Sequence, residues 1–101
     1  MKRYIALVEV MRPEQDDKFI DFVKSLGLGY WHWIDGSWLL VDSRNREGLH
    51  TAIRDKLLEI APGKNSFVAA VETSKEWAGF GPSDKQDTEK NMFHWLHKNW
   101  A

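Results

Sequence analysis

The sequence predicts an α+β fold in which four antiparallel strands form one sheet and two helices cover one of its faces. Three observations predict it: helical apolar stripes alternate with β-rich runs, an Asp-Gly pair separates two of those runs, and the elements follow the order strand, helix, strand, strand, helix, strand. This order is the ferredoxin-like βαββαβ plan, in which the third and fourth strands flank the first. The 101 residues suit one domain, with a core over 1–73 and a C-terminal loop and helix over 74–101 that complete it.

Hydrophobic periodicity places the individual elements. Residues 3–11 and 66–72 are rich in β-formers and predict the first and fourth strands. Residues 13–26 and 47–60 carry apolar side chains at helical spacing and predict the two helices, the first with acidic residues in its opening turn. A further helix is expected over roughly 88–99, after an aromatic loop rich in Gly and Pro.

Residues 29–42 contain the clearest local pattern, because Asp35-Gly36 is a preferred pair for a two-residue type I′ hairpin turn. Such a turn implies this register: Ile34 with Ser37, Trp33 with Trp38, His32 with Leu39, Trp31 with Leu40, and Tyr30 with Val41. Side chains alternate across a strand, so one face receives Trp31, Trp33, Trp38 and Leu40, and the other receives Tyr30, His32, Ile34, Leu39 and Val41. Both faces of the sheet are therefore predicted to be apolar.

Two helices can cover only one face of this sheet, so the second apolar face needs another cover. The aliphatic set matches the helix stripes better, and we expect the tryptophans on the face away from the helices. The cover could be the C-terminal segment, a second copy of the chain, or a ligand that stacks on aromatic rings; we favour the first two. The candidate binding or interface residues are Trp31, Trp33, Trp38, Trp77, Phe80, Trp95 and Trp100.

Composition excludes several classes of function. The chain contains six Trp and no Cys. Without Cys it has no disulfide, no thiolate metal site and no Cys nucleophile, and the absence of Cys fits a cytoplasmic location. A formal net charge of -1 gives no general attraction to phosphate backbones. No segment reaches the roughly 20 apolar residues of a membrane-spanning helix, and no phosphate-binding or nucleophile motif occurs. We expect a cytoplasmic protein without membrane association.

The His residues do not predict a metal site. His94 and His97 share a helical face, but Lys90 lies one turn before them and a third ligand is lacking. His32 is expected to be a hydrogen-bonded core residue and His50 a surface residue of the second helix. We predict no metal and no cofactor.

The main rival is a divergent metal-dependent nuclease with Glu9 and Asp42 as its acids, because Glu9, Asp42 and Glu72 lie near predicted strand ends. The strand order weakens this hypothesis. It places Asp42 and Glu72 beside Lys2 and Arg3, with Glu9 at the opposite edge. An ion pair with Arg3 is therefore favoured over a metal site.

Nucleotide, small-ligand or nucleic-acid binding is the second alternative, because aromatic side chains on open sheet faces stack bases. The first strand offers only Tyr4, and the hairpin aromatics have no interleaved Arg or Lys. Arg44, Arg46 and Arg54 could supply a modest anion-binding patch nearby.

Several segments resemble a family of small bacterial proteins. They are Tyr30-Trp-His-Trp-Ile, Ser37-Trp-Leu-Leu-Val-Asp42, Ile53-Arg-Asp-Lys-Leu57, Val68-Ala-Ala-Val-Glu72, Trp77-Ala-Gly-Phe-Gly81 and Trp95-Leu96. Over roughly 28–97 the chain resembles the uncharacterised "SinR family" proteins, which are similar in fold to CRISPR-associated ferredoxin-like adaptation nucleases and related toxins. The resemblance implies a dimer formed around the sheet and a link to mobile elements or defence. The acid of those nucleases could correspond to Glu9, but Val10 and Met11 follow it in place of polar residues, so nuclease activity is not carried over.

The sequence thus predicts a non-enzymatic binding or interaction module. We expect it to self-associate as a homodimer through an aromatic-rich sheet face and the C-terminal segment. A protein partner, a nucleotide or a nucleic acid are the other partners considered.

Overall fold

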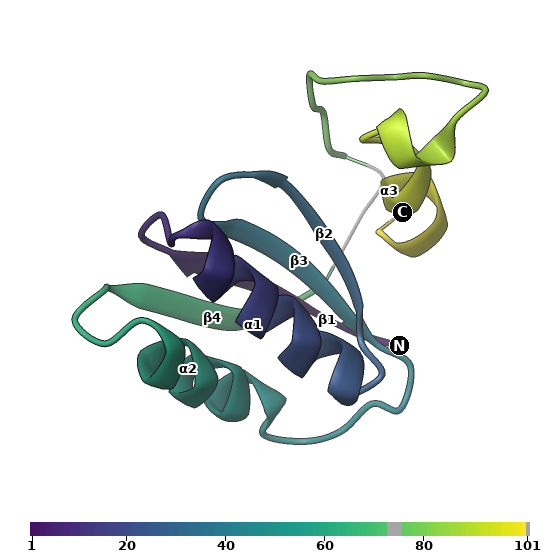
Figure 1. Cartoon of the computed structure of the whole chain (residues 1–101). Coiled ribbons are helices and arrows are strands. Elements are labelled where there is room, and N and C mark those ends of the chain that lie inside the picture. Colours follow the sequence, from purple (N-terminus) through teal and green to yellow (C-terminus); the bar gives the residue numbers. More distant parts are fainter. Residues whose placement is uncertain (73–75, 101) are drawn as a thin grey trace. The chain divides into compact units, whose positions relative to one another are not determined.

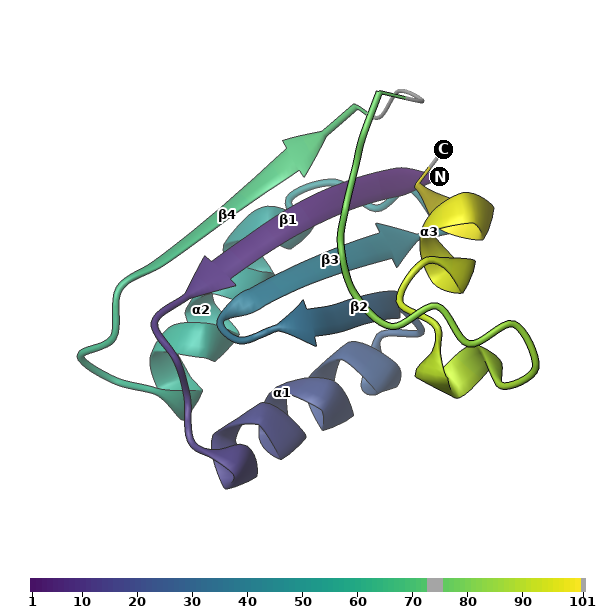
Figure 2. The same cartoon turned by 90° about the horizontal axis from the view of Figure 1, so that it is seen from above.

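The computed structural model describes residues 1–72 and 76–100, and the chain forms two compact units, residues 1–71 and 72–101. The first unit contains strands β1 (Lys2–Val8), β2 (Gly29–Ile34), β3 (Ser37–Asp42) and β4 (Ser66–Val71) and helices α1 (Pro13–Ser25) and α2 (Leu49–Ile60). The strands form one antiparallel sheet in the order β2-β3-β1-β4 (Figures 1 and 2). The ferredoxin-like α+β prediction is confirmed.

Helices α1 and α2 lie on the same side of the sheet and enclose the core with it (Figures 1 and 2). One face of β1 contributes Tyr4, Ala6 and Val8. The largest members from the other elements are Phe19, Val23, Trp38, Leu40, Leu49, Ile53 and Leu57. Fully burying one large apolar side chain contributes about 1.5–3 kcal/mol, so these residues fix the side of the sheet that the helices cover.

Local capping explains where α1 begins. Pro13 occupies the first turn, where a missing N–H costs nothing. The side chain of Gln15 accepts the backbone N–H of Arg12 at 2.9 Å and donates to the carbonyl oxygen of Ile60 at 3.2 Å. The buried Gln15 side chain therefore both caps α1 and connects it to the end of α2.

The β2–β3 hairpin has the predicted two-residue loop but not the predicted register. Ile34 pairs with Ser37, whereas Trp31 pairs with Leu39 and Tyr30 with Leu40. The register shifts between Trp31 and Ile34, where His32 and Trp33 together oppose Trp38, as in a β-bulge. The predicted pairs of Trp31 with Leu40 and of Tyr30 with Val41 are therefore wrong by one residue.

The turn itself is not type I′. That turn needs positive φ at both central residues, but Asn45 is the one residue other than glycine with positive φ in the described chain. Gly36 has φ 73 and Asp35 does not share that region. A turn with one left-handed residue fits the strand twist less well, and the adjacent bulge adds twist to the ribbon.

The bulge changes which tryptophan faces the helices. Trp38 is fully buried in the core, with its ring 4.8 Å from the Phe19 ring in an edge-to-face arrangement. The expectation that Trp38 lies with Trp31 on the face away from the helices is wrong, because the extra residue in β2 places Trp31 opposite Leu39 rather than Leu40. Leu39 and Val41, expected toward the helices, instead share the face of Trp31.

The second unit has little regular structure, with a short 3-10 helix η1 (Thr88–Lys90) and helix α3 (His94–Asn99). The predicted helix over 88–99 is shorter because polar side chains compete for backbone groups. Asp87 accepts the N–H of Glu89, and Asn91 accepts the N–H of Phe93 at 2.9 Å. In the described ranges no helix has both the length and the apolar character to cross a bilayer.

Gly36 gives a test of the hairpin geometry. Its φ is positive, and a Cβ there would clash with the carbonyl oxygen of Val8. We expect Gly36→Ala to destabilise the fold by more than the roughly 1–2 kcal/mol of left-handed strain alone, as measured by urea unfolding. Gly63→Ala is the matched control, since Gly63 has φ 87 with nothing within 4 Å of its Cβ position. Equal losses for the two variants would contradict the close approach.

Candidate interaction surface

The sheet face opposite the helices is apolar, as expected. Because Tyr4, Ala6 and Val8 point into the core, the register places the intervening β1 residues and their partners on the other side. We call this the outer face. It comprises Ile5, Leu7, Trp31, Leu39, Val41, Phe67, Ala69 and Val71, with Arg3 as the one charged strand residue among its positions.

Exposure on the outer face is uneven. Trp31 and Val41 are buried, whereas Leu7 is 43% exposed and Phe67 is 62% exposed. Leu7 and Phe67 are direct partners across the β1–β4 ladder. They line a shallow hollow of about 440 Å³ with the hairpin turn at Asp35 and Gly36. Large apolar side chains thus meet solvent on the β1–β4 half of the sheet.

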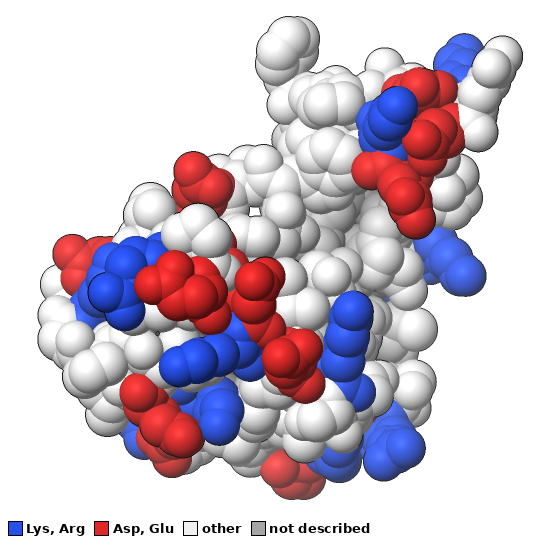
Figure 3. All heavy atoms as spheres, viewed as in Figure 1, with Lys and Arg blue, Asp and Glu red and all other residues white. Residues whose placement is uncertain are grey.

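The helix side of the unit has the opposite character. Basic and acidic side chains alternate over α1 and α2 (Figure 3). Several of them form exposed pairs, such as Arg54 with Asp55 at 2.7 Å and Lys56 with Glu59 at 3.2 Å. Such mixed charge keeps a surface in water, so the outer face is the better candidate for an interface.

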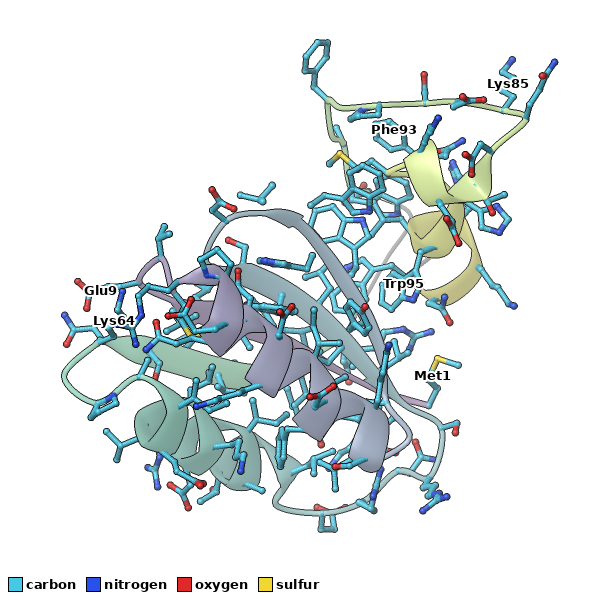
Figure 4. All side chains as sticks on the ribbon, in the orientation of Figure 1. Met1, Glu9, Lys64, Lys85, Phe93 and Trp95 are labelled. Carbon is cyan, nitrogen blue, oxygen red and sulfur yellow. The ribbon has the colours of Figure 1, made fainter. Side chains whose placement is uncertain are left out.

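Glu9 has a structural role at the end of β1. Its carboxylate accepts the backbone N–H of Asn65 at 2.5 Å, and its own N–H donates to the carbonyl oxygen of Asn65 at 3.1 Å. Beside it, Lys64 donates to the carbonyl oxygen of Val10 (Figure 4). These bonds tie the exit of β1 to the entry of β4.

Asp42 is a fully buried carboxylate that organises the loop after β3. It accepts backbone N–H groups from Arg44 at 3.1 Å and Arg46 at 2.9 Å, and the Arg46 guanidinium lies 3.1 Å from its Oδ1. The same guanidinium donates to the carbonyl oxygen of Leu26 at 2.6 Å. Burial alone would raise the pKa of Asp42, but these hydrogen bonds outweigh it and lower the pKa to about 2. The favoured partner Arg3 is therefore wrong for Asp42; the partner is Arg46.

Glu9 and Asp42 cannot share a metal ion. Asp42 pairs with Lys2 at the start of β1, and Glu9 follows the end of β1, seven residues beyond Lys2. This corresponds to about 23 Å at roughly 3.3 Å per residue. No group of three His, Cys, Asp or Glu side chains that could hold a metal ion occurs within residues 1–72 and 76–100.

His32 is hydrogen-bonded and packed, as expected of a core residue. Its Nδ1 lies 2.9 Å from the carbonyl oxygen of Ser37, and its ring stacks on Trp38 with centroids 3.5 Å apart. Its Nε2 lies 3.8 Å from Asp16. Burial raises the pKa of Asp16, while His32 acts in the opposite direction. These contacts hold the bulge of β2 against β3 and α1.

The other predicted site residues are distributed over both units. Arg46 and Arg54 are engaged with carboxylates, and Arg44 is exposed. Trp33 is 38% exposed on β2. In the second unit the ring of Trp77 lies 5.2 Å from that of His97, Trp95 lies 6.1 Å from Trp100, and Phe80 is 99% exposed; Trp95 and Phe93 are marked in Figure 4.

Leu7 and Phe67 were missed by the sequence reasoning. Both lie in runs that are apolar at nearly every position, so alternation alone does not tell the two faces apart. The two faces are told apart by the pairing of β4 with β1, which places the odd-numbered residues of both strands on one face.

Comparison with known proteins gives one distant structural likeness. No family model matches the chain, and no curated protein matches it. The chain is similar to the crystal structure of hypothetical protein MJ1052 from Methanocaldococcus jannascii, with a TM-score of 0.47 and 15% identity over 79% of this chain and 90% of that chain. The resemblance to the "SinR family" is not tested by these comparisons and stays a prediction.

The Asp42 carboxylate predicts acid sensitivity. A carboxyl whose pKa falls from 3.8 to about 2 on folding contributes about 2 kcal/mol, present in full above the unfolded pKa and lost as the pH falls through the folded one. We expect unfolding free energy to drop between these values and Asp42→Asn to remove most of that drop, as measured by denaturant titrations across pH. Asp55→Asn is the control, because the Arg54–Asp55 pair is exposed; an equal effect in both variants would contradict the assignment.

Proposed function

We propose that this chain is a non-enzymatic interaction module that self-associates around its sheet. The observation that supports it is the exposed pair Leu7 and Phe67 on an outer face that is otherwise apolar. Contiguous exposed apolar surface of this kind marks interaction sites in proteins.

A second copy of the chain is the partner that this surface fits best. The outer face offers Arg3 as its one charged strand position, so a partner surface rich in charge would lose hydration without finding counter-charges. The apolar strand residues of a second copy complement it, and two-fold homodimers are the commonest oligomers.

The nuclease alternative has no support in the geometry. Asp42 is enclosed by Arg46 and two backbone N–H groups, and Glu9 is committed to Asn65 at the far end of β1. We expect no cleavage of RNA or DNA with Mg²⁺ or Mn²⁺. Metal-dependent cleavage that Glu9→Ala abolishes would favour the nuclease instead.

Self-association is tested by sedimentation equilibrium of the full chain. We expect a dimer mass, and Phe67→Asp should weaken dimerisation about 30-fold, because loss of a central contact costs about 2 kcal/mol. Lys24→Asp is the control: Lys24 is exposed and lies on α1, whose Asp16 faces His32 of β2, on the side of the sheet opposite to β4. A monomer at all concentrations, or equal weakening by both variants, would overturn the proposal.

A further inference from the structure

We infer that β4 pairs antiparallel with β4 of a second copy, so that two sheets join edge to edge. This rests on the proposed self-association and identifies the surface that mediates it. The alternative contact, stacking of two outer faces, is disfavoured because the outer face is small. Four strands about 4.8 Å apart, each about 20 Å long, cover about 400 Å², less than the roughly 800 Å² per partner of a standard interface.

The edge strand β4 lacks the features that normally block edge pairing. Edge strands are commonly protected by charged residues, Pro or bulges. The β4 sequence Ser-Phe-Val-Ala-Ala-Val, residues 66–71, contains none of these. It pairs with β1 in an unbroken register from Arg3↔Val71 to Val8↔Ser66, and no described strand pairs with its outer side. Its outward N–H and C=O groups form a regular template.

The opposite edge of the same sheet is protected. Strand β2 carries the bulge between Trp31 and Ile34, which interrupts the spacing of its outward backbone groups. The two edges therefore differ within one sheet, and the contrast assigns pairing to β4.

Side-chain faces restrict the register. A two-fold axis perpendicular to the sheet keeps the helices of both copies on one side, so each residue must oppose one from the same face. A pairing centred on Ala69 meets this condition. It places Phe67 opposite Val71 of the second copy, an aromatic and β-branched pair of the kind that stabilises cross-strand contacts. A pairing centred on Val68 would place Phe67 opposite Ala69 and lose that contact.

The absence of cysteine from the chain allows a direct test by disulfide formation. In the proposed register Ala69 faces Ala69 of the second copy, with Cα atoms about 4.5–5.5 Å apart, which lies within the range that a disulfide spans. We expect Ala69→Cys to form a covalent dimer under mild oxidation. Because pairing brings the thiols to millimolar effective concentration, the reaction should be about 100-fold faster than for Lys24→Cys, an exposed position on α1.

Two further variants test the register. Ala70→Cys faces Val68 of the second copy, so its own counterpart lies about 8 Å away, beyond disulfide reach. A mixture of Phe67→Cys and Val71→Cys chains should cross-link with each other faster than either does alone. Efficient cross-linking of Ala70→Cys but not Ala69→Cys would overturn the register.

The outcomes separate this inference from the proposed function. A dimer mass by sedimentation with rapid cross-linking of Ala69→Cys supports both. A dimer mass with cross-linking of Ala69→Cys no faster than that of Lys24→Cys overturns edge pairing and leaves self-association in place. A monomer mass with no cross-linking overturns both. Circular dichroism identical to that of the parent chain establishes that each variant folds.

Discussion

The central strand β1 is the constraint on which the rest of the structure depends. It pairs with β3 on one side and β4 on the other, through six residue pairs in each ladder. Because Tyr4, Ala6 and Val8 are buried beneath the helices, every residue paired with them is directed to the helix side of the sheet. Every residue paired with Ile5 and Leu7 is directed away from it. One strand therefore sets the composition of both faces, including the position of Phe67.

The charged residues that most resemble a catalytic set are structural. Asp42 is held by Arg46 and by backbone N–H groups, and Arg46 also reaches Leu26, so this pair closes the loops at one end of the sheet. Glu9 performs the equivalent task at the other end through Asn65. Both carboxylates hold loops in place, and both oxygens of Asp42 are occupied by hydrogen bonds. The exposed half of the outer face, by contrast, is apolar.

The two edges of the sheet show how a small sheet can restrict its own partners. The bulge in β2 brings His32 onto the Trp38 ring and distorts that edge. Strand β4 has a regular, uncharged edge. A sheet with one distorted and one regular edge can form a closed pair but not an open array, because each copy offers one pairing edge. This arrangement fits a two-fold homodimer.

The sequence by itself determined the fold class, the six elements of the first unit and the apolar character of both sheet faces, because periodicity and turn residues are local properties that the chain expresses without its partners. The half-buried, hydrogen-bonded setting of His32 also followed from sequence. Only the tertiary structure decided that Trp38 lies under α1, that Asp42 binds Arg46 rather than Arg3, and that Leu7 and Phe67 meet solvent together. Each of these depends on a register, and a bulge of one extra residue in β2 changes cross-strand partners without leaving a mark on hydrophobic alternation.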